Sequence, residues 1–222
     1  MVVAPVRFRP GRSDYHPAPL SSHTGILVIS DARPILDLSV EESTEPGSTR
    51  VLVGGIGLPW LRDLDFGTQF IRRVEELEWP EDVALEDLSY AAHRVLHTLQ
   101  DLRPRKVVLV GAMPRDVDPP GTVRRYQLDL TPPPDEEVAD RLGEAVGGII
   151  DLDHTLAVVR YWKGFPAETV VIEVEPADRA FGLGFSPEVE SSVETVLAMV
   201  REELETRSAP ADGGEDPAEA DI

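Results

Sequence analysis

The stretch Val51-Leu52-Val53-Gly54-Gly55-Ile56-Gly57 decides the fold of this chain. It is a short apolar run that ends in a glycine turn, a pattern typical of a buried strand leading into a helix. The predicted helix ends at Pro80, because proline cannot continue a helix. Its apolar residues recur on one face at helical spacing: Phe66, Phe70, Val74 and Leu77. The sequence therefore predicts a strand and a helix packed face to face, the unit from which α/β sheets are built.

Further strands and helices alternate along the chain in the same way. Three more apolar runs predict buried strands: Val83–Leu85, Val107–Val110 and Thr169–Val174. A helix with Ala92, Val95, Leu96 and Leu99 on one face separates the first two of these runs. The segment 121–130 mixes apolar and polar residues, which favours a half-exposed strand paired antiparallel at an edge. The pattern predicts an α/β fold, a three-layer sandwich with a mixed, mostly parallel five-stranded sheet.

The second half of the chain adds three helices. Helical periodicity appears at Asp135–Val146 and at Leu152–Trp162. Ser186-Pro187-Glu188 predicts the start of the last helix, because serine caps a helix, proline fits its first turn and an acid complements its positive end. The buried stripe of this helix consists of Val189, Val193, Val196, Leu197 and Val200.

The composition changes at both ends of the chain. Residues 1–24 are rich in proline and lack periodicity, which predicts a flexible arm. Residues 25–49 hold two short apolar runs, Ile26–Ser30 and Ile35–Val40, interpreted as extra strands before a linker. Residues 50–206 form the predicted α/β domain. Residues 207–222 are acidic and rich in Ala, Pro and Gly, typical of a disordered tail.

Composition and charge exclude several classes of function. The 222 residues include 41 acidic and 21 basic side chains, and the formal charge of -20 disfavours binding to nucleic acid or anionic membranes. No cysteine is present, which excludes disulfides, thiolate metal sites and a cysteine nucleophile. No apolar run long enough for a membrane span or resembling a signal peptide occurs, so a cytoplasmic protein is expected.

The motifs of two other functional classes are incomplete or missing in this sequence. Gly55-Ile56-Gly57 after a strand suggests a nucleotide-binding domain, but Trp60 occupies the third glycine position of GxGxxG. No GxxxxGK[ST] phosphate loop and no GxSxG nucleophile elbow is present. Both a nucleotide-binding domain and a serine hydrolase are therefore disfavoured.

Four segments, taken in order, resemble the hydrogenase maturation proteases, the endopeptidases that trim the C-terminus of the large subunit of nickel-iron hydrogenases. The segments are Gly55 to Gly67, similar to the family's GxGNxLxxD[DE]GxG motif; Val107 to Met113 with Pro120-Gly121-Thr122-Val123; His154-Thr155-Leu156-Ala157; and Val170 to Val189, with the turn Glu175-Pro176 and the helix start GLGFSPEV. The resemblance covers roughly Arg50 to Glu205 and implies the family's phosphorylase/hydrolase-like fold.

The resemblance also implies where a site lies. In the family, an acid after the first strand, an aspartate ending the third strand and a histidine at a helix start recognise nickel in the precursor. The corresponding residues here are Leu64, Gly111 and His154, so one of the three ligands is kept. Asp65, one position past Leu64, is a candidate replacement. We therefore predict nickel contact by His154 and Asp65, with nickel carried by the substrate and no cofactor of the chain's own.

Asp63 and Asp87 are further candidates for the cleft. Asp63 matches the first acid of the family's pair, and Asp87 ends the second strand at the carboxyl edge of the sheet, where α/β sites lie. Each carboxylate has a simpler interpretation as a helix cap or a partner of the helix dipole. His154 equally suits a packed or capping histidine. Trp60 is interpreted as packing, or as a seat for an apolar peptide side chain. No residue is assigned a catalytic role.

Two functions follow from these patterns. The first is a hydrogenase maturation protease-like protein that acts on the C-terminus of a nickel-iron hydrogenase large-subunit precursor. The alternative is a catalytically degenerate homologue that binds a hydrogenase subunit or a maturation factor without cleavage. The loss of carboxylates at Leu64 and Gly111 leaves the two open.

Overall fold

The computed structural model of the chain describes residues 49–89 and 91–206, and these residues contain a five-stranded sheet. The strands are β1 (Val51–Ile56), β2 (Val83–Asp87), β3 (Lys106–Ala112), β4 (Val123–Gln127) and β5 (Glu168–Val174), in the order β2-β1-β3-β5-β4. β1, β2, β3 and β5 run parallel, whereas β4 pairs antiparallel with β5 at the edge. The predicted mixed, mostly parallel sheet with an antiparallel edge strand is confirmed.

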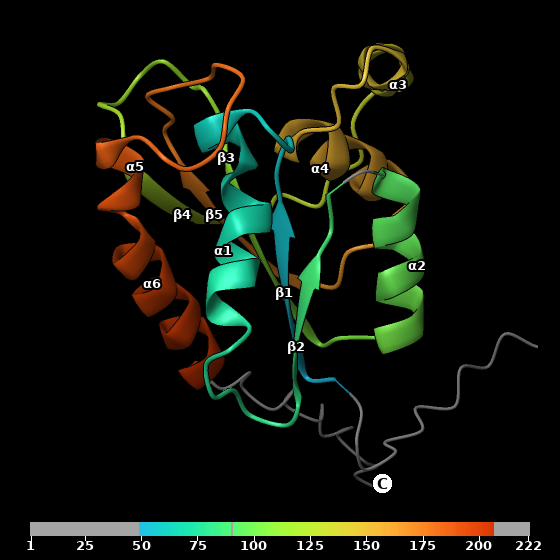
Figure 1. Ribbon diagram of the computed structural model, residues 1–222. Helices are drawn as coiled ribbons and strands as arrows, with labels where there is room; N and C mark the ends of the chain where they lie inside the picture. Colours follow the sequence, from blue (N-terminus) through green and yellow to red (C-terminus); the bar gives the residue numbers. More distant parts are fainter. Residues whose placement is uncertain (1–48, 90, 207–222) are drawn as a thin grey trace, which may run out of the picture. The chain divides into compact units, whose positions relative to one another are not determined.

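Helices cover both faces of the sheet (Figure 1). α1 (Phe66–Val74) and α6 (Val193–Glu205) share one core with residues such as Val53 and Val110, while α2 (Ala92–Leu102) and α4 (Leu152–Tyr161) share the other with Leu52 and Leu109. The alternation of side chains along each strand supplies both cores. The predicted three-layer arrangement is confirmed.

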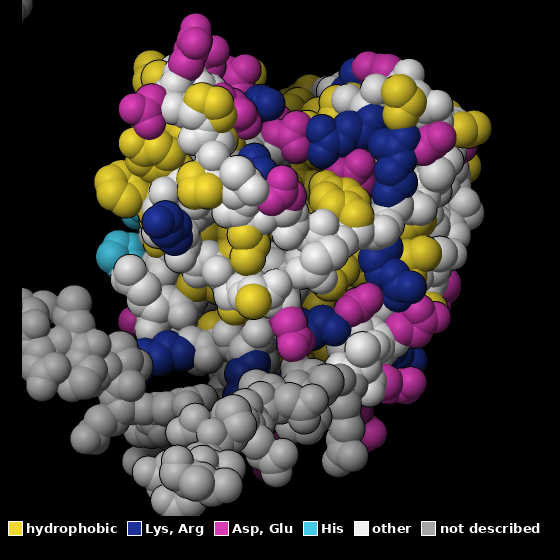
Figure 2. All heavy atoms as spheres, turned by 180° about the vertical axis from the view of Figure 1, so that it is seen from behind, with side chains coloured by type: hydrophobic (Ala, Val, Ile, Leu, Met, Phe, Trp, Pro, Cys, Tyr) yellow, Lys and Arg dark blue, Asp and Glu magenta, His cyan; other side chains and the backbone are white. Residues whose placement is uncertain are grey.

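Three shorter or more peripheral helices complete the described chain. They are η1 (Arg62–Asp65), α3 (Asp135–Val146), which packs on α4, and α5 (Pro187–Glu190). Basic side chains lie among acidic ones on the face seen in Figure 2, so the acidic excess does not form one block there.

Helix ends are where the sequence predictions fail. The first helix ends at Val74 instead of continuing to Pro80, and Leu77, predicted on its buried face, is 39% exposed. The predicted last helix is divided into α5 and α6, with Ser191 and Ser192 between them. The predicted start is right, because the Ser186 hydroxyl accepts a hydrogen bond from the Val189 amide and Pro187 occupies the first turn.

Several predictions fall on residues that the structure does not describe. The arm (1–24), most of the segment 25–49 with its two short strands, and the acidic tail (207–222) lie outside the described residues. No helix among the residues that are described combines the length and the apolar character that a membrane crossing needs.

Close approach of α1 to the sheet depends on one glycine. A Cβ added to Gly67 would lie 2.2 Å from the Ile56 amide nitrogen and 2.5 Å from the Val110 carbonyl oxygen. Backbone atoms cannot move out of the way as a flexible side chain can. Gly67 therefore fixes how near the first turn of α1 lies to β1 and β3.

We expect Gly67→Ala to destabilise the protein by about 3 kcal/mol, because the added methyl group must push α1 away from the sheet. Chemical denaturation monitored by circular dichroism measures the change. Gly143→Ala is the matched control, because nothing lies within 4 Å of a Cβ built at Gly143 on α3. The control is expected to stabilise the helix by about 0.5–1 kcal/mol. Equal stability of Gly67→Ala and the natural chain would contradict the packing argument.

Candidate functional site

The loops that leave the carboxyl ends of β1 and β5 lie together at one edge of the sheet. The Gly182 amide donates a hydrogen bond to the Trp60 carbonyl oxygen at 2.7 Å, and the Asp63 amide donates to the Asp178 carbonyl oxygen at 3.2 Å. Residues Leu61 and Gly182 also form an isolated parallel bridge. Ligands of open α/β sheets bind at this edge, so the two loops form the natural rim of a site.

Asp63 joins these two loops through its side chain. The carboxylate is fully buried and accepts four hydrogen bonds: from the Ser186 amide (2.7 Å), the Ser186 hydroxyl (2.8 Å), the Ala177 amide (2.9 Å) and the Asp178 amide (2.7 Å). These donors occupy both carboxylate oxygens and compensate the loss of water around the charge. The side chain of Asp63 therefore links the loop after β1 to the loop after β5, and these four hydrogen bonds are called the Asp63 tie below.

Asp65 and Asp87 lie near each other, with Thr68 between them. The Thr68 hydroxyl lies 3.4 Å from Asp87 Oδ1, which also accepts a hydrogen bond from the Ser89 amide at 3.1 Å. Asp65 is 5% exposed; its Oδ2 accepts a hydrogen bond from Gln69, while its Oδ1 has no hydrogen-bond partner among the described residues. Burial raises the pKa of the Asp65 carboxyl, and the charge of Asp87 acts in the same direction.

His154 lies in the first turn of α4 and faces α3. Its amide donates to the side chain of Asp151, the N-cap residue of α4, at 2.8 Å. Its ring Nδ1 lies 2.9 Å from the Arg141 carbonyl oxygen on α3, and the residue is 3% exposed. A carbonyl oxygen only accepts hydrogen bonds, so Nδ1 carries the proton and Nε2 is the nitrogen able to bind a metal or a proton.

The two positions at which the resemblance implies carboxylates, Leu64 and Gly111, differ: Leu64 is half-buried in η1, whereas the backbone around Gly111 is closely packed. The Leu64 amide donates to the Leu61 carbonyl oxygen at 2.9 Å within η1. A Cβ added to Gly111 would lie 2.9 Å from the Ile56 carbonyl oxygen, so an acid at this position requires a backbone shift. Across residues 49–89 and 91–206, no three histidine, aspartate or glutamate side chains are arranged to hold a metal ion.

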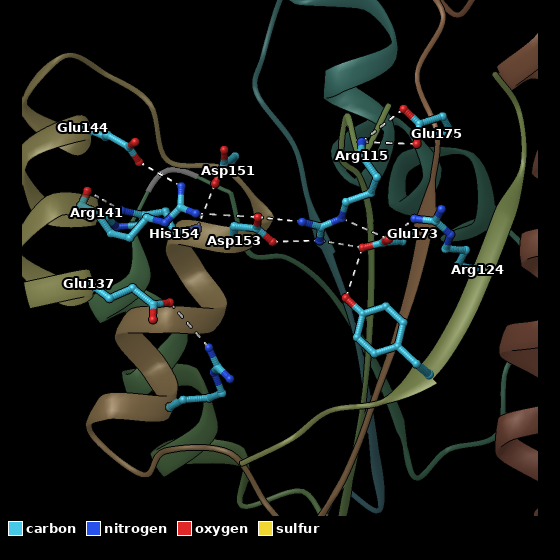
Figure 3. A network of polar contacts seen from close by, with 12 residues as sticks. Arg115, Arg124, Glu137, Arg141, Glu144, Asp151, Asp153, His154, Glu173 and Glu175 are labelled. Atoms are coloured by element: carbon cyan, nitrogen blue, oxygen red, sulfur yellow. Dashed lines mark hydrogen bonds and ion pairs between the residues drawn. The ribbon is translucent and has the colours of Figure 1, made fainter. Parts of the chain in front are cut away.

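Next to Gly111, the carboxyl edge holds an ion-pair network centred on Arg115 (Figure 3). Asp153 on α4 binds the guanidinium through two contacts of 2.8 Å, and Glu173 on β5 binds it at 2.8 and 3.1 Å. The Tyr126 hydroxyl donates to Glu173 at 3.1 Å. Gly111 and Glu173 are register partners on neighbouring strands, so the acid beside Gly111 in the sheet is bound to an arginine.

The contacts within this network fix the ionisation states of Arg115 and Tyr126. The hydrogen bonds to Glu173 raise the pKa of Arg115, and burial with the nearby Glu173 charge raises the pKa of the Tyr126 hydroxyl. Arg115 thus stays charged and Tyr126 stays neutral at any physiological pH. Arg115 pairs with both Asp153 and Glu173, and each acid has a further arginine: Arg124 lies 3.5 Å from Glu173 and Arg141 lies 3.7 Å from Asp153. Both acids are therefore already paired with cations of the chain itself.

Sequence reasoning missed this network. One feature of the sequence indicates an ion pair here: Glu173 is the single acid inside the predicted buried strand Thr169–Val174, and a buried acid needs a partner. Arg115 gives no such indication, since it lies in a polar loop 38 residues from Asp153 and 58 residues from Glu173. Such pairs depend on tertiary contacts that local patterns do not show.

An open apolar rim lies beside the polar edge. Trp60 is 56% exposed, and Phe181 and Leu183 on the β5 loop are more exposed still. Trp60 has φ of 70° and Arg62 has φ of 42°, both in the left-handed region that costs free energy for residues other than glycine. The prediction that Trp60 is a packing residue is wrong, because more than half of the residue is exposed. The strained loop presents its indole to solvent.

No protein-family model matches the chain. The candidate hydrogenase maturation protease of Methanocaldococcus jannaschii is 28% identical to it over 82 residues, which cover 37% of this chain and 53% of the relative. The chain thus spans about half the length of the curated relative it matches.

Solved structures share the architecture. An endopeptidase from Escherichia coli, determined in solution, is 25% identical, with 69% of this chain and 93% of that chain covered and a TM-score of 0.51. The E. coli hydrogenase maturating endopeptidase HybD is 24% identical over 69% of this chain and 93% of its own, with a TM-score of 0.52. The hydrogenase 2 maturation peptidase of a Thaumarchaeota archaeon is 23% identical over 70% and 97%, with a TM-score of 0.50. The last two show a common fold, and the resemblance predicted from the four segments is confirmed.

We expect Asp65→Asn to stabilise the protein at pH 7 by about 1 kcal/mol. Because the pKa of Asp65 is raised in the folded state, folding favours the protonated acid, and its contribution is lost as pH rises through that raised pKa. The gain should therefore shrink as pH falls toward the ordinary value of 3.8. Thermal unfolding between pH 4 and 8 measures it. Asp101→Asn, at an exposed position of α2, is the control. A loss of stability at pH 7 would contradict the interpretation.

Proposed function

We propose that this divergent member of the hydrogenase maturation protease family acts on the C-terminus of a nickel-iron hydrogenase large-subunit precursor, as an endopeptidase of the cytoplasm. The observation that carries the proposal is the tie made by Asp63. It joins the loop of the first motif to the loop of the fourth, and the two loops form the rim of the carboxyl edge. The segments that resemble the family are thus the segments that build this rim.

Nickel enters the proposal as part of the substrate. His154 presents Nε2 as its metal-binding nitrogen, because Nδ1 is held by the Arg141 carbonyl oxygen. Asp65 Oδ1 is the described carboxylate oxygen that lies buried without a hydrogen-bond partner. These two groups are the chain's best remaining candidates for contact with a nickel ion that the precursor carries, and the chain needs no resident metal for this role.

The apolar rim gives the precursor a place to bind. Trp60, Phe181 and Leu183 are exposed on the two loops that Asp63 joins. Exposed aromatic side chains on a rigid support are typical anchors for a peptide or protein partner. We infer that this rim contacts the precursor beside the cleavage point.

Binding without cleavage is the second candidate function, and one observation favours it. Arg115 binds Asp153 and Glu173, the register partner of Gly111, so these carboxylates are already paired with a cation of the chain itself. Such a protein would keep the loops that bind the partner and lack the groups needed to cleave it. The partner in that case is a hydrogenase subunit or another maturation factor.

Incubation of the full chain with a nickel-loaded large-subunit precursor separates the two functions. Mass spectrometry is expected to show loss of the C-terminal peptide. His154→Ala should lower the cleavage rate at least about 100-fold, because the imidazole is the family ligand that this chain keeps. His93→Ala, at an exposed position of α2, is the matched control and should cleave at the normal rate.

Two outcomes would contradict the endopeptidase. Binding of the precursor without cleavage, under conditions in which HybD cleaves its own precursor, would support the degenerate homologue. Neither binding nor cleavage with any nickel-loaded precursor would contradict both functions.

A further inference from the structure

We propose that the outward side of α3 is a docking surface for a partner protein segment that carries apolar side chains flanked by lysine or arginine. The surface consists of an apolar ridge (Leu142, Val146 and Ile149) and an acidic stripe (Glu136, Asp140 and Glu144). It consists of exposed residues of α3 and its C-terminal turn, and is distinct from the loops of the proposed active site.

The apolar ridge is exposed although it belongs to an ordered element. Leu142 is 51% exposed, Val146 91% and Ile149 46%. The Gly148 amide donates to the Ala145 carbonyl oxygen and the Ile149 amide to that of Glu144, the pattern of a Schellman motif that closes the helix end. The ridge is therefore fixed in position, and its exposure is not the result of a frayed end.

α3 uses little of its apolar surface to bind the rest of the protein. Val138 is its one buried residue, and the helix packs mainly on α4. Figure 1 shows α3 standing apart from the layers, and at the upper left of Figure 2, where α3 projects, hydrophobic and acidic side chains lie side by side. A helix side of this kind is typical of a site where a partner buries apolar anchors.

The acidic stripe indicates the charge of the partner. Glu136, Asp140 and Glu144 follow one another at spacings of four residues, which places like charges side by side. The last turn of α3 holds no basic residue, so Glu144 also faces the negative end of the helix dipole. Arg141 pairs with Glu144 at 3.0 Å, whereas neither Glu136 nor Asp140 forms an ion pair with a base among the described residues. A basic partner relieves these repulsions.

The two halves of the surface can be reached together. On a helix of 3.6 residues per turn, Ala139 and Gly143 lie between the apolar ridge and the acidic stripe. Both are exposed, and no atom lies within 4 Å of a Cβ built at Gly143. A groove of about 410 Å³ runs along the acidic side, lined in part by Glu136, Asp140 and Glu144. A partner backbone can cross the small residues, with apolar side chains on the ridge and long basic side chains in the groove.

A second copy of this chain does not fit the surface. A two-fold contact of α3 with itself would set the acidic stripe of one copy against that of the other, on chains that each carry a formal charge of -20. The same charge disfavours an anionic membrane. The observations therefore favour a basic, amphipathic protein segment, and this inference does not depend on the proposed peptidase activity.

A pair of synthetic peptides tests the proposal with the full chain. One is an amphipathic helix with leucine on one side and lysine along both flanks; the other has glutamate in place of every lysine. Fluorescence anisotropy should show binding of the leucine-lysine peptide alone, weakening with added salt. Hydrogen exchange should show protection confined to residues 135–149. Protection elsewhere, or equal binding of the glutamate peptide, would overturn the proposal.

Three variants separate this surface from general attraction to an acidic protein. Val146→Ser and Asp140→Asn should each weaken binding of the leucine-lysine peptide about tenfold, since each removes one half of the surface. Val117→Ser is the matched control, because Val117 is 71% exposed in the loop after β3, and its affinity should not change. Circular dichroism confirms that each variant is folded. Unchanged affinity of Val146→Ser, or a dimer of the natural chain that Val146→Ser dissociates, would contradict a separate basic partner.

Discussion

The buried carboxylate of Asp63 is the interaction on which the arrangement of the carboxyl edge depends. A charge without water is unfavourable unless hydrogen bonds replace the lost hydration, and Asp63 receives four of them from one loop. These bonds connect η1, just before α1, to the start of α5, because Ser186 both donates to Asp63 and caps α5. The exposed rim of Trp60 and Phe181 is held in place by this tie.

The carboxyl edge of the sheet next to Asp63 also holds a cation, the guanidinium of Arg115. Arg115 is bound by Asp153 on α4 and by Glu173 on β5, the register partner of Gly111. A site of this composition has no group of three acids or histidines in the described residues for a metal. In the proposed function, recognition of a nickel-bearing substrate therefore rests on His154, on Asp65 and on the rim, with fewer oxygen ligands than the family resemblance implies.

Local patterns in the sequence predicted what local interactions determine. The strand at Val51–Ile56 and the cap at Ser186 follow from a short apolar run and from capping chemistry, and both are present. The end of the first helix was wrong, because Leu77 extends a periodic pattern beyond the residues that the sheet covers. The tie of Asp63 and the pairing of Arg115 join residues more than 35 positions apart in the chain, so no local pattern could indicate them.

Amide hydrogen exchange in Asp63→Asn tests the tie most directly. Asparagine offers one accepting oxygen where aspartate offers two, so the donors of the β5 loop lose partners. We predict that the amides of Ala177, Asp178 and Ser186 exchange at least about tenfold faster in the variant, while the amides of β3 keep their protection. Unchanged exchange at these three amides would contradict the claim that Asp63 holds the two loops together.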